Sequence, residues 1–443
     1  MIKLIINLTF CFISIFIFLL SPSSYSYEYN FFILLIFIII NVFLYFFEIR
    51  GKGIGFELIF MISFMMVNLI YPVFYYESNP YFSLFAYSFP ENVISKSSAI
   101  ALVAYSFYVL GITSYKNIDY SLKKIVVSDS YIKINLFFVV FLYLLFFLTG
   151  GLQIFDNIYA GNQYSESSIA WYILVFMNIL LYMLCSVILI SKKNIIKFLS
   201  LFIILIVMIS FLLTGARLLA ISLAVILLAS YSFNVKKISI LNSLLTIFIG
   251  SNILFFILKF REDGMSFSRL GVIYDDFKDR GSFFDPFTDL IINNRNLYIL
   301  VDYVDVNGFT YFKNILFSLF TIIPGSSFLI ELFSVPENLR GNLTTYLTLG
   351  GAGDFGFGTN MVGEAYLSLG ILGVILVFYI FGLCIKYFKN NRNNSIYEYT
   401  VYMYLISQAV FYPRIDYLWG IRSILWMLIL IVLISFISKK LSN

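Results

Sequence analysis

Three arginines stand beside apolar runs that are long enough to cross a membrane. Arg217 opens one such run in "FLLTGARLLAISLAVILL", and Arg414 and Arg422 flank the start of the last run. A guanidinium is always charged and presents a planar set of donors that binds two phosphate oxygens at once. If these helix ends converge, the three side chains form one anion site, and a lipid pyrophosphate is the ligand that fits its charge and depth.

The position of Arg217 favours the same ligand. It falls in the first turn of the expected helix, where free backbone N–H groups also attract an anion. Asp416 is the acidic residue near Arg414 and Arg422, and none lies close to Arg217 in the sequence. The alternative role for Arg217 is to extend its charge to the membrane surface, as arginines near helix ends often do. Arg340, in "ENLRGN", is a fourth candidate for binding the pyrophosphate.

A reaction that removes a proton at such a site also needs a base, and the chain contains no histidine. Glu364 is our candidate: it opens an apolar run, and no cation is adjacent to it in the sequence. Ionisable groups at such depth are often functional. The alternative is that Glu364 only complements the helix dipole. Asp354 and Asp416 are weaker candidates for the base, and Glu57 is expected to be structural.

The elements that position these residues are membrane helices, as the composition indicates. Apolar residues make up 61% of the 443, charged residues 12%, and mean hydropathy is +0.93. Soluble chains carry roughly 25% charged residues. Cys11, Cys185 and Cys384 all fall in apolar runs, where cysteine acts as a small hydrophobic residue rather than in a metal site or a disulfide framework. We expect an all-α polytopic membrane protein.

A bilayer is crossed by a helix of about 20 apolar residues, and twelve runs approach that length. They are residues 2–20, 31–47, 54–76, 97–114, 133–149, 168–190, 198–213, 217–233, 238–258, 363–385, 397–412 and 419–437. The first follows Lys3 as a signal peptide would, but its apolar stretch is longer than usual and no cleavage pattern follows it. We therefore expect about twelve transmembrane helices.

The distribution of lysines predicts the orientation of the chain in the membrane. With the N-terminus inside, the inner segments and Lys3 and Lys133 carry 17 of the 29 lysines and arginines. The short outer connections hold Lys96, Arg217, Arg414 and Arg422. Because cytoplasmic loops are enriched in positive charge, both termini are expected to be cytoplasmic. The inner segments are "EIRGKG", "KNIDYSLKK", "SKKNIIK", "NVKK", "KYFKNNRN" and "SKKLSN".

One connection is long. Residues 259–362 carry 8 basic and 12 acidic residues and are expected to form a large external loop between the ninth and tenth spans. Its stretch "NILFSLFTIIPGSSFLIELF" is broken at Pro324-Gly325, so it is expected to lie in the interface or to re-enter the membrane. The chain thus divides into nine spans (1–258), the loop (259–362) and three spans (363–443).

Arginine and lysine are distributed differently across the membrane. In this topology 15 of 19 lysines are cytoplasmic, whereas 8 of 10 arginines are external. A topology signal needs only charge, so an external surplus of guanidinium groups indicates binding of phosphate oxygens there. Two simpler explanations remain open: small numbers, and arginines pairing with the acidic residues of the loop.

Several of these features resemble one family. "TGAR" opening a span, the late external loop, and "GFGTNMVGEAYLSLGILGVILVFYIFG" leading into a span look like Wzy-type O-antigen or capsular oligosaccharide repeat-unit polymerases. The resemblance implies a metal-independent membrane glycosyltransferase without a cofactor, in a bacterial inner membrane, with its active site facing the periplasm or exterior. Undecaprenyl-pyrophosphate-linked oligosaccharide would be donor and acceptor, and a separate chain-length regulator is a possible partner.

Other functions are less well supported. O-antigen ligases have a similar topology, but that family relies on an external-loop histidine, and the chain contains none. A flippase or other transporter is expected to place charges in mid-span and to lack a long external loop. A scaffolding role does not account for arginines at outer helix ends. The net charge of +5 is ordinary for a membrane protein and does not indicate a nucleic-acid partner.

Overall fold

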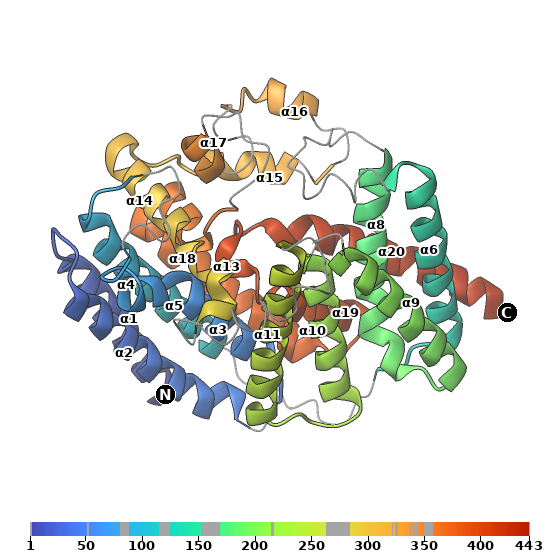
Figure 1. Cartoon of the computed structure of the whole chain (residues 1–443). Helices are drawn as coiled ribbons and strands as arrows, with labels where there is room; N and C mark the ends of the chain where they lie inside the picture. Colours follow the sequence, from blue (N-terminus) through green and yellow to red (C-terminus); the bar gives the residue numbers. More distant parts are fainter. Residues whose placement is uncertain are drawn as a thin grey trace.

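Long apolar helices make up the body of the molecule, as Figure 1 shows. The computed structural model describes residues 2–50, 53–79, 88–114, 125–151, 169–213, 217–262, 284–320, 322–323, 327–336, 339, 343–349 and 358–442. Within these ranges the chain is helical and contains no β-strand. The predicted all-α membrane fold is therefore confirmed.

In the described ranges, nine helices are long and apolar enough to cross a membrane. They are α1 (Ile2–Leu19), α2 (Tyr27–Leu44) continued by the π-helix η1 (Tyr45–Ile49), α5 (Asn92–Ser114), α6 (Asp129–Leu148), α8 (Ile169–Val187) continued by η2 (Ile188–Ile190), α9 (Asn194–Leu213), α10 (Arg217–Asn234), α18 (Met361–Asn391) and α20 (Trp419–Ser442).

Each of the other three predicted runs also contains a helix, but its fully described part is shorter than 18 residues. They are α3 (Phe56–Asn68) with α4 (Ile70–Phe74), α11 (Ile240–Glu262, with side chains described as far as Ile253), and α19 (Ile396–Gln408) with η7 (Tyr412–Arg414). Twelve spans and cytoplasmic termini thus remain predictions.

The predicted run 54–76 does not form one helix. α3 ends at Asn68, and Leu69 has a non-helical φ of −126° before α4 begins. The side-chain amide of Asn68 donates to the backbone carbonyl of Phe64. The side-chain oxygen of Asn68 accepts from the side-chain amide of Asn360. A side chain that bonds its own backbone and a distant element competes with helix continuation, so the break occurs where α3 meets the start of α18.

α5 and α18 cross at the centre of the molecule. Gly111 and Gly382 lie at the crossing, and a methyl group on either would overlap backbone atoms of the other helix. Small residues allow two membrane helices to approach this closely. The crossing fixes α18, whose first turn carries Glu364, against the most buried span of the protein.

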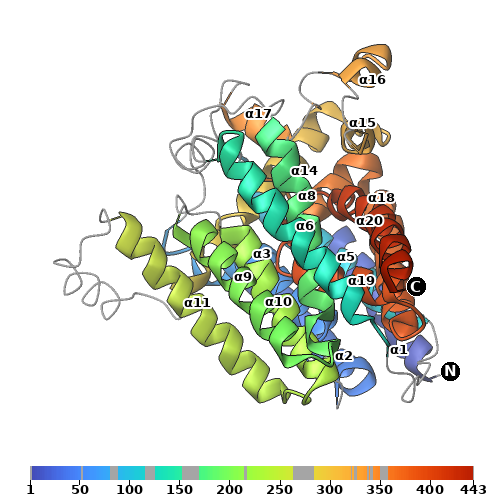
Figure 2. The same cartoon turned by 90° about the vertical axis from the view of Figure 1, so that its right-hand side faces the viewer.

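The connection between α11 and α18 contains short helices. They are η4 (Asp285–Phe287), α13 (Thr288–Ile291), α14 (Asn294–Asn307), η5 (Lys313–Ile315), α15 (Leu316–Phe320), α16 (Ser327–Leu332) and α17 (Leu343–Leu349). In Figure 1, α15, α16 and α17 lie at the top, opposite the turn that joins α10 to α11. α14 packs against α18 and α5. Figure 2 shows α11 at the periphery, beside α10.

Candidate functional site

α18 begins with a capped first turn that carries Glu364. The side-chain oxygen of Asn360 accepts hydrogen bonds from the amides of Val362 (2.9 Å) and Gly363 (3.1 Å). An asparagine at this position satisfies donors that the first turn leaves free. The helix start and the Glu364 backbone are therefore held by a local bond pattern.

α18 is interrupted after two turns. Leu369 and Gly370 have non-helical torsion angles, and Gly370 has a φ of +60°, which glycine adopts without a steric penalty. The break leaves the Leu367 carbonyl without its helical donor, and the Thr310 amide (2.9 Å) and hydroxyl (3.1 Å) both donate to it. A broken membrane helix is tolerated where its backbone is satisfied in this way. The short first half presents Glu364 and Ser368.

The carboxylate of Glu364 is buried and hydrogen-bonded at both oxygens. The Thr359 hydroxyl donates to Oε1 (2.6 Å), and the Asn314 side-chain amide donates to Oε2 (2.8 Å). The residue is 6% exposed. Thr359 precedes α18, whereas Asn314 comes from η5. The carboxylate is thus fixed between two elements rather than free to move with its helix.

Further polar groups extend from this carboxylate. Ser368 donates to the side-chain oxygen of Asn314 (3.0 Å), and its hydroxyl lies 2.9 Å from that of Tyr417. Asp416 is close enough to Glu364 for their charges to interact. Burial raises the pKa of the Asp416 carboxyl, while the amides of Leu418 and other backbone donors act in the opposite direction. The segment before α20 therefore adds a second acid to the site.

Two arginines lie close enough to each other to interact. Arg217, at the start of α10, has Nη1 2.7 Å from Oδ2 of Asp289 in α13. Arg414, in η7, interacts electrostatically with both Asp289 and Arg217. Burial lowers the pKa of the Arg414 guanidinium; Asp289 acts against this and Arg217 adds to it. Asp289 thus pairs with one guanidinium and influences the other.

Thr359 joins the carboxylate to the arginines. Its amide donates to the carbonyl of Arg414 (3.3 Å), while its hydroxyl holds Glu364. Gly358, with a φ of +71°, lies so close that a methyl group there would stand 3.2 Å from the Arg414 carbonyl. Thr359 therefore bonds both the carboxylate of Glu364 and the backbone of Arg414, and Arg414 in turn interacts with Arg217.

The other predicted residues are Arg422, Arg340 and Asp354. Arg422, near the start of α20, interacts electrostatically with Tyr404 of α19. Arg340 and Asp354 lie outside the described residues.

Comparison with known proteins identifies the family. The family model of the O-antigen polysaccharide polymerase Wzy matches residues 3–443. The chain belongs to this family. No curated protein and no solved structure matches it.

Wzy-family proteins are glycosyltransferase-type polymerases that join lipid-linked oligosaccharide repeat units. Together with the apolar helices, membership makes this chain a multi-pass protein of the bacterial inner membrane. The resemblance found in the sequence is thus confirmed. The roles of individual residues stay predictions.

Several residues of this Wzy site escaped the sequence analysis. Asp289, Asn314 and Thr359 are common loop residues whose roles depend on contacts with distant segments. A stronger indication of a polar interior than these three residues was present in "INNRNLY", where three asparagines surround Arg295. All four side chains are buried, and Arg295 donates to Thr348 (2.9 Å). A run of polar residues at the start of an otherwise apolar helix indicates a polar interior.

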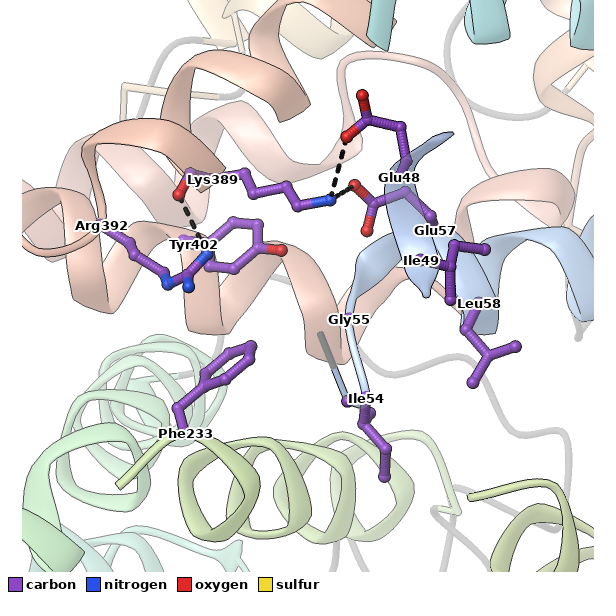
Figure 3. A pocket seen from close by; sticks show the side chains of 11 residues that line it. Glu48, Ile49, Ile54, Gly55, Glu57, Leu58, Phe233, Lys389, Arg392 and Tyr402 are labelled. Carbon is purple, nitrogen blue, oxygen red and sulfur yellow. Dashed lines mark hydrogen bonds and ion pairs between the residues drawn. The ribbon is translucent and has the colours of Figure 1, made fainter. Parts of the chain in front are cut away.

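A second polar cluster, seen from close by in Figure 3, lies at the other end of α18, which is predicted to be the inner end. The Lys389 ammonium contacts the carboxylates of Glu57 and Glu48, and Lys386 pairs with Glu48 at 2.8 Å. Arg392 lies 5.0 Å from the ring centre of Phe233. These paired charges join η1, α3 and α18, in keeping with the structural role predicted for Glu57.

Proposed function

We propose that the chain transfers a growing glycan from undecaprenyl pyrophosphate to the acceptor sugar of a new lipid-linked repeat unit, at the outer face of the membrane. One observation carries the proposal: Thr359 bonds both the buried carboxylate of Glu364 and the backbone carbonyl of Arg414, an arginine that interacts electrostatically with Arg217. Family membership supplies the polymerisation in general. The geometry supports specific roles for the three side chains.

The proposed reaction forms one bond and breaks another. A hydroxyl oxygen of the acceptor sugar attacks the anomeric carbon of the donor glycan, and the bond from that carbon to the pyrophosphate oxygen breaks. The hydroxyl proton passes to Glu364, and the electron pair leaves with the pyrophosphate. A positioned base typically contributes about 10²–10⁴-fold to the rate. Hydrogen bonds from Thr359 and Asn314 hold both oxygens of this base in place.

Arg217 and Arg414 are proposed to stabilise the leaving pyrophosphate. Fixed positive groups placed where negative charge develops are among the strongest sources of catalysis. Both guanidiniums are permanently charged, and Arg414 interacts electrostatically with Arg217 and with its partner Asp289. Such a clamp needs no metal ion. Arg340 and Arg422 remain predicted contacts to the same pyrophosphate.

The decisive experiment removes the gene and separates surface glycans by gel electrophoresis. We expect the ladder of polymer lengths to disappear and a single attached repeat unit to remain, with the ladder restored by the wild-type gene. Polymer accumulating on its lipid carrier without attachment would indicate a ligase instead. Loss of all glycan, including the single unit, would indicate a flippase.

A further inference from the structure

An apolar cavity of about 90 Å³, partly open at its surface, lies between α3, α10 and α11. Its walls are formed mainly by aliphatic side chains. They include Ile59 and Ile62 from α3, Val225 and Leu228 from α10, and Thr246 and Ile247 from α11. Tightly packed interiors leave few spaces larger than a water molecule. A cavity of this size therefore needs an occupant or a reason to stay open.

α11 is the helix whose small side chains leave this space unfilled. Its side toward the cavity carries the small residues Ser243 and Thr246, and a methyl group added at Gly250 would meet no atom within 4 Å. Leu245 and Ile249, on other faces of the helix, are 50% and 56% exposed. α11 thus has bulky side chains toward the lipid and small ones toward the bundle. This distribution leaves room for a flexible hydrocarbon chain between the helices.

One end of the cavity adjoins the arginine pair. Phe287 and Leu290 line it, and Asp289 between them is the partner of Arg217. On α10 the lining residues Val225 and Leu228 follow Arg217 by two to three turns, roughly 12–17 Å along the helix. A molecule with a charged head at Arg217 therefore has an apolar path along α10 for its tail.

We propose that this cavity binds the first isoprene units of the lipid carrier, whose diphosphate lies between Arg217 and Arg414. The proposal rests on the polymerase function and names the lipid site for it. The head is chosen by position, since the cavity adjoins the arginine pair that the proposed function assigns to the pyrophosphate, and a guanidinium binds two phosphate oxygens at once. The remainder of the chain leaves between α10 and α11 into the bilayer.

Photolabelling of the full-length protein in nanodiscs tests this site. One probe is a polyprenyl diphosphate with a diazirine near its head, and a second is phosphatidylglycerol with a diazirine in an acyl chain. We expect the diphosphate probe to label peptides of α10 and α11 around Val225 and Thr246. Unlabelled undecaprenyl diphosphate should compete with it. The phospholipid probe should label the lipid-facing surface without such competition.

Three tryptophan variants, two in the cavity and one matched control, locate the label. Thr246→Trp fills the cavity and should reduce the competed labelling by about tenfold, because a bulky side chain takes the space that the ligand needs. Leu245→Trp adds the same bulk on an exposed face of α11 and should leave labelling unchanged. Leu228→Trp, from the α10 wall, should reproduce the effect of Thr246→Trp. Size-exclusion profiles confirm that each variant is folded.

Three results would overturn the proposal. Equal labelling by both probes without competition would mean that ordinary lipid fills the cavity. Unchanged labelling in both cavity variants, or competed labelling elsewhere, would place the isoprenoid in another groove while leaving the polymerase function intact. A normal glycan ladder in the deletion strain would instead contradict the polymerase function, and this lipid site with it.

Discussion

Arg217 and Asp289 form an ion pair although 72 residues separate them in the sequence, with 2.7 Å between Nη1 and Oδ2. Their side chains are 23% and 52% exposed, and ion pairs with that access to solvent contribute only about 0–1 kcal/mol to stability. Arg414 faces the same carboxylate. The pair is therefore better suited to holding two guanidiniums in position than to stabilising the fold.

Arg217→Lys and Asp289→Asn separate these two roles. The lysine keeps the charge but loses the planar fork that binds two oxygens at once, so polymer formation should fall on the order of a hundredfold while protein levels hold. Asp289→Asn keeps both arginines but removes the carboxylate that positions them, so it should lower polymer formation less than Arg217→Lys does. Glycan ladders and immunoblots of complemented deletion strains measure both effects.

Arg392→Lys is the matched control for the Arg217 variant, because Arg392 lies at the opposite end of the bundle beside Phe233. It should leave the ladder unchanged. If Asp289→Asn damaged polymer formation as severely as Arg217→Lys, the arginine would serve to anchor α13 rather than to bind pyrophosphate.

Glu364→Gln tests the proposed base. The side chain keeps its shape and its bond from Asn314 but cannot accept the hydroxyl proton, so turnover should fall by about 10²-fold or more. Binding of a lipid-linked repeat unit should persist, as measured with purified protein in nanodiscs. Glu398→Gln is the control, since Glu398 is also a first-turn acid, in α19. Equal, small effects of the two variants would assign Glu364 to the helix dipole alone.

The sequence predicts the class of fold because membrane helices are specified locally, by the length and hydropathy of each run. The arginine and carboxylate at the starts of α10 and α18 could be singled out for the same reason: a charge is conspicuous in an apolar surrounding. The partners of these groups could not be found this way. Asp289 and Asn314 lie in the long external connection, and only folding brings them to Arg217 and Glu364.

The breaks inside helices are the other features that hydropathy does not reveal. Leu369 and Gly370 sit within a continuous apolar stretch, so the sequence predicted one uninterrupted span there. The interruption depends on Thr310, which supplies donors for the freed carbonyl of Leu367. The break after α3 had a weak signal, because Asn68 and Pro72 interrupt the apolar run.

Gly373→Ala should disrupt the broken helix more than Gly370→Ala. A methyl group at 373 would overlap the backbone carbonyl oxygen of Ala365, which cannot move without shifting the turn that carries Glu364. At 370 it would meet the ring of Phe309 at 2.7 Å, and the ring is able to turn aside, although the φ of +60° still costs about 1 kcal/mol or more.

Thermal midpoints of the purified variants and glycan ladders measure the two effects. Adding Phe309→Ala should restore part of the stability lost in Gly370→Ala and none of that lost in Gly373→Ala. Rescue of both variants, or of neither, would mean that these contacts do not set the geometry of the break.

Glu48→Gln should lower the thermal midpoint far more than Lys3→Met. Glu48 faces three ammonium groups, and its pair with Lys386 is fully buried, with both side chains 0% exposed. Removing one partner of a buried pair typically costs about 3–5 kcal/mol. The Lys3 side chain is 26% exposed, and Glu48 keeps the ammonium groups of Lys386 and Lys389 when Lys3 is removed, so the loss should stay near 1 kcal/mol or less. Equal shifts in the two variants, measured in the same detergent, would show that the cluster at the inner end does not hold η1 against α18.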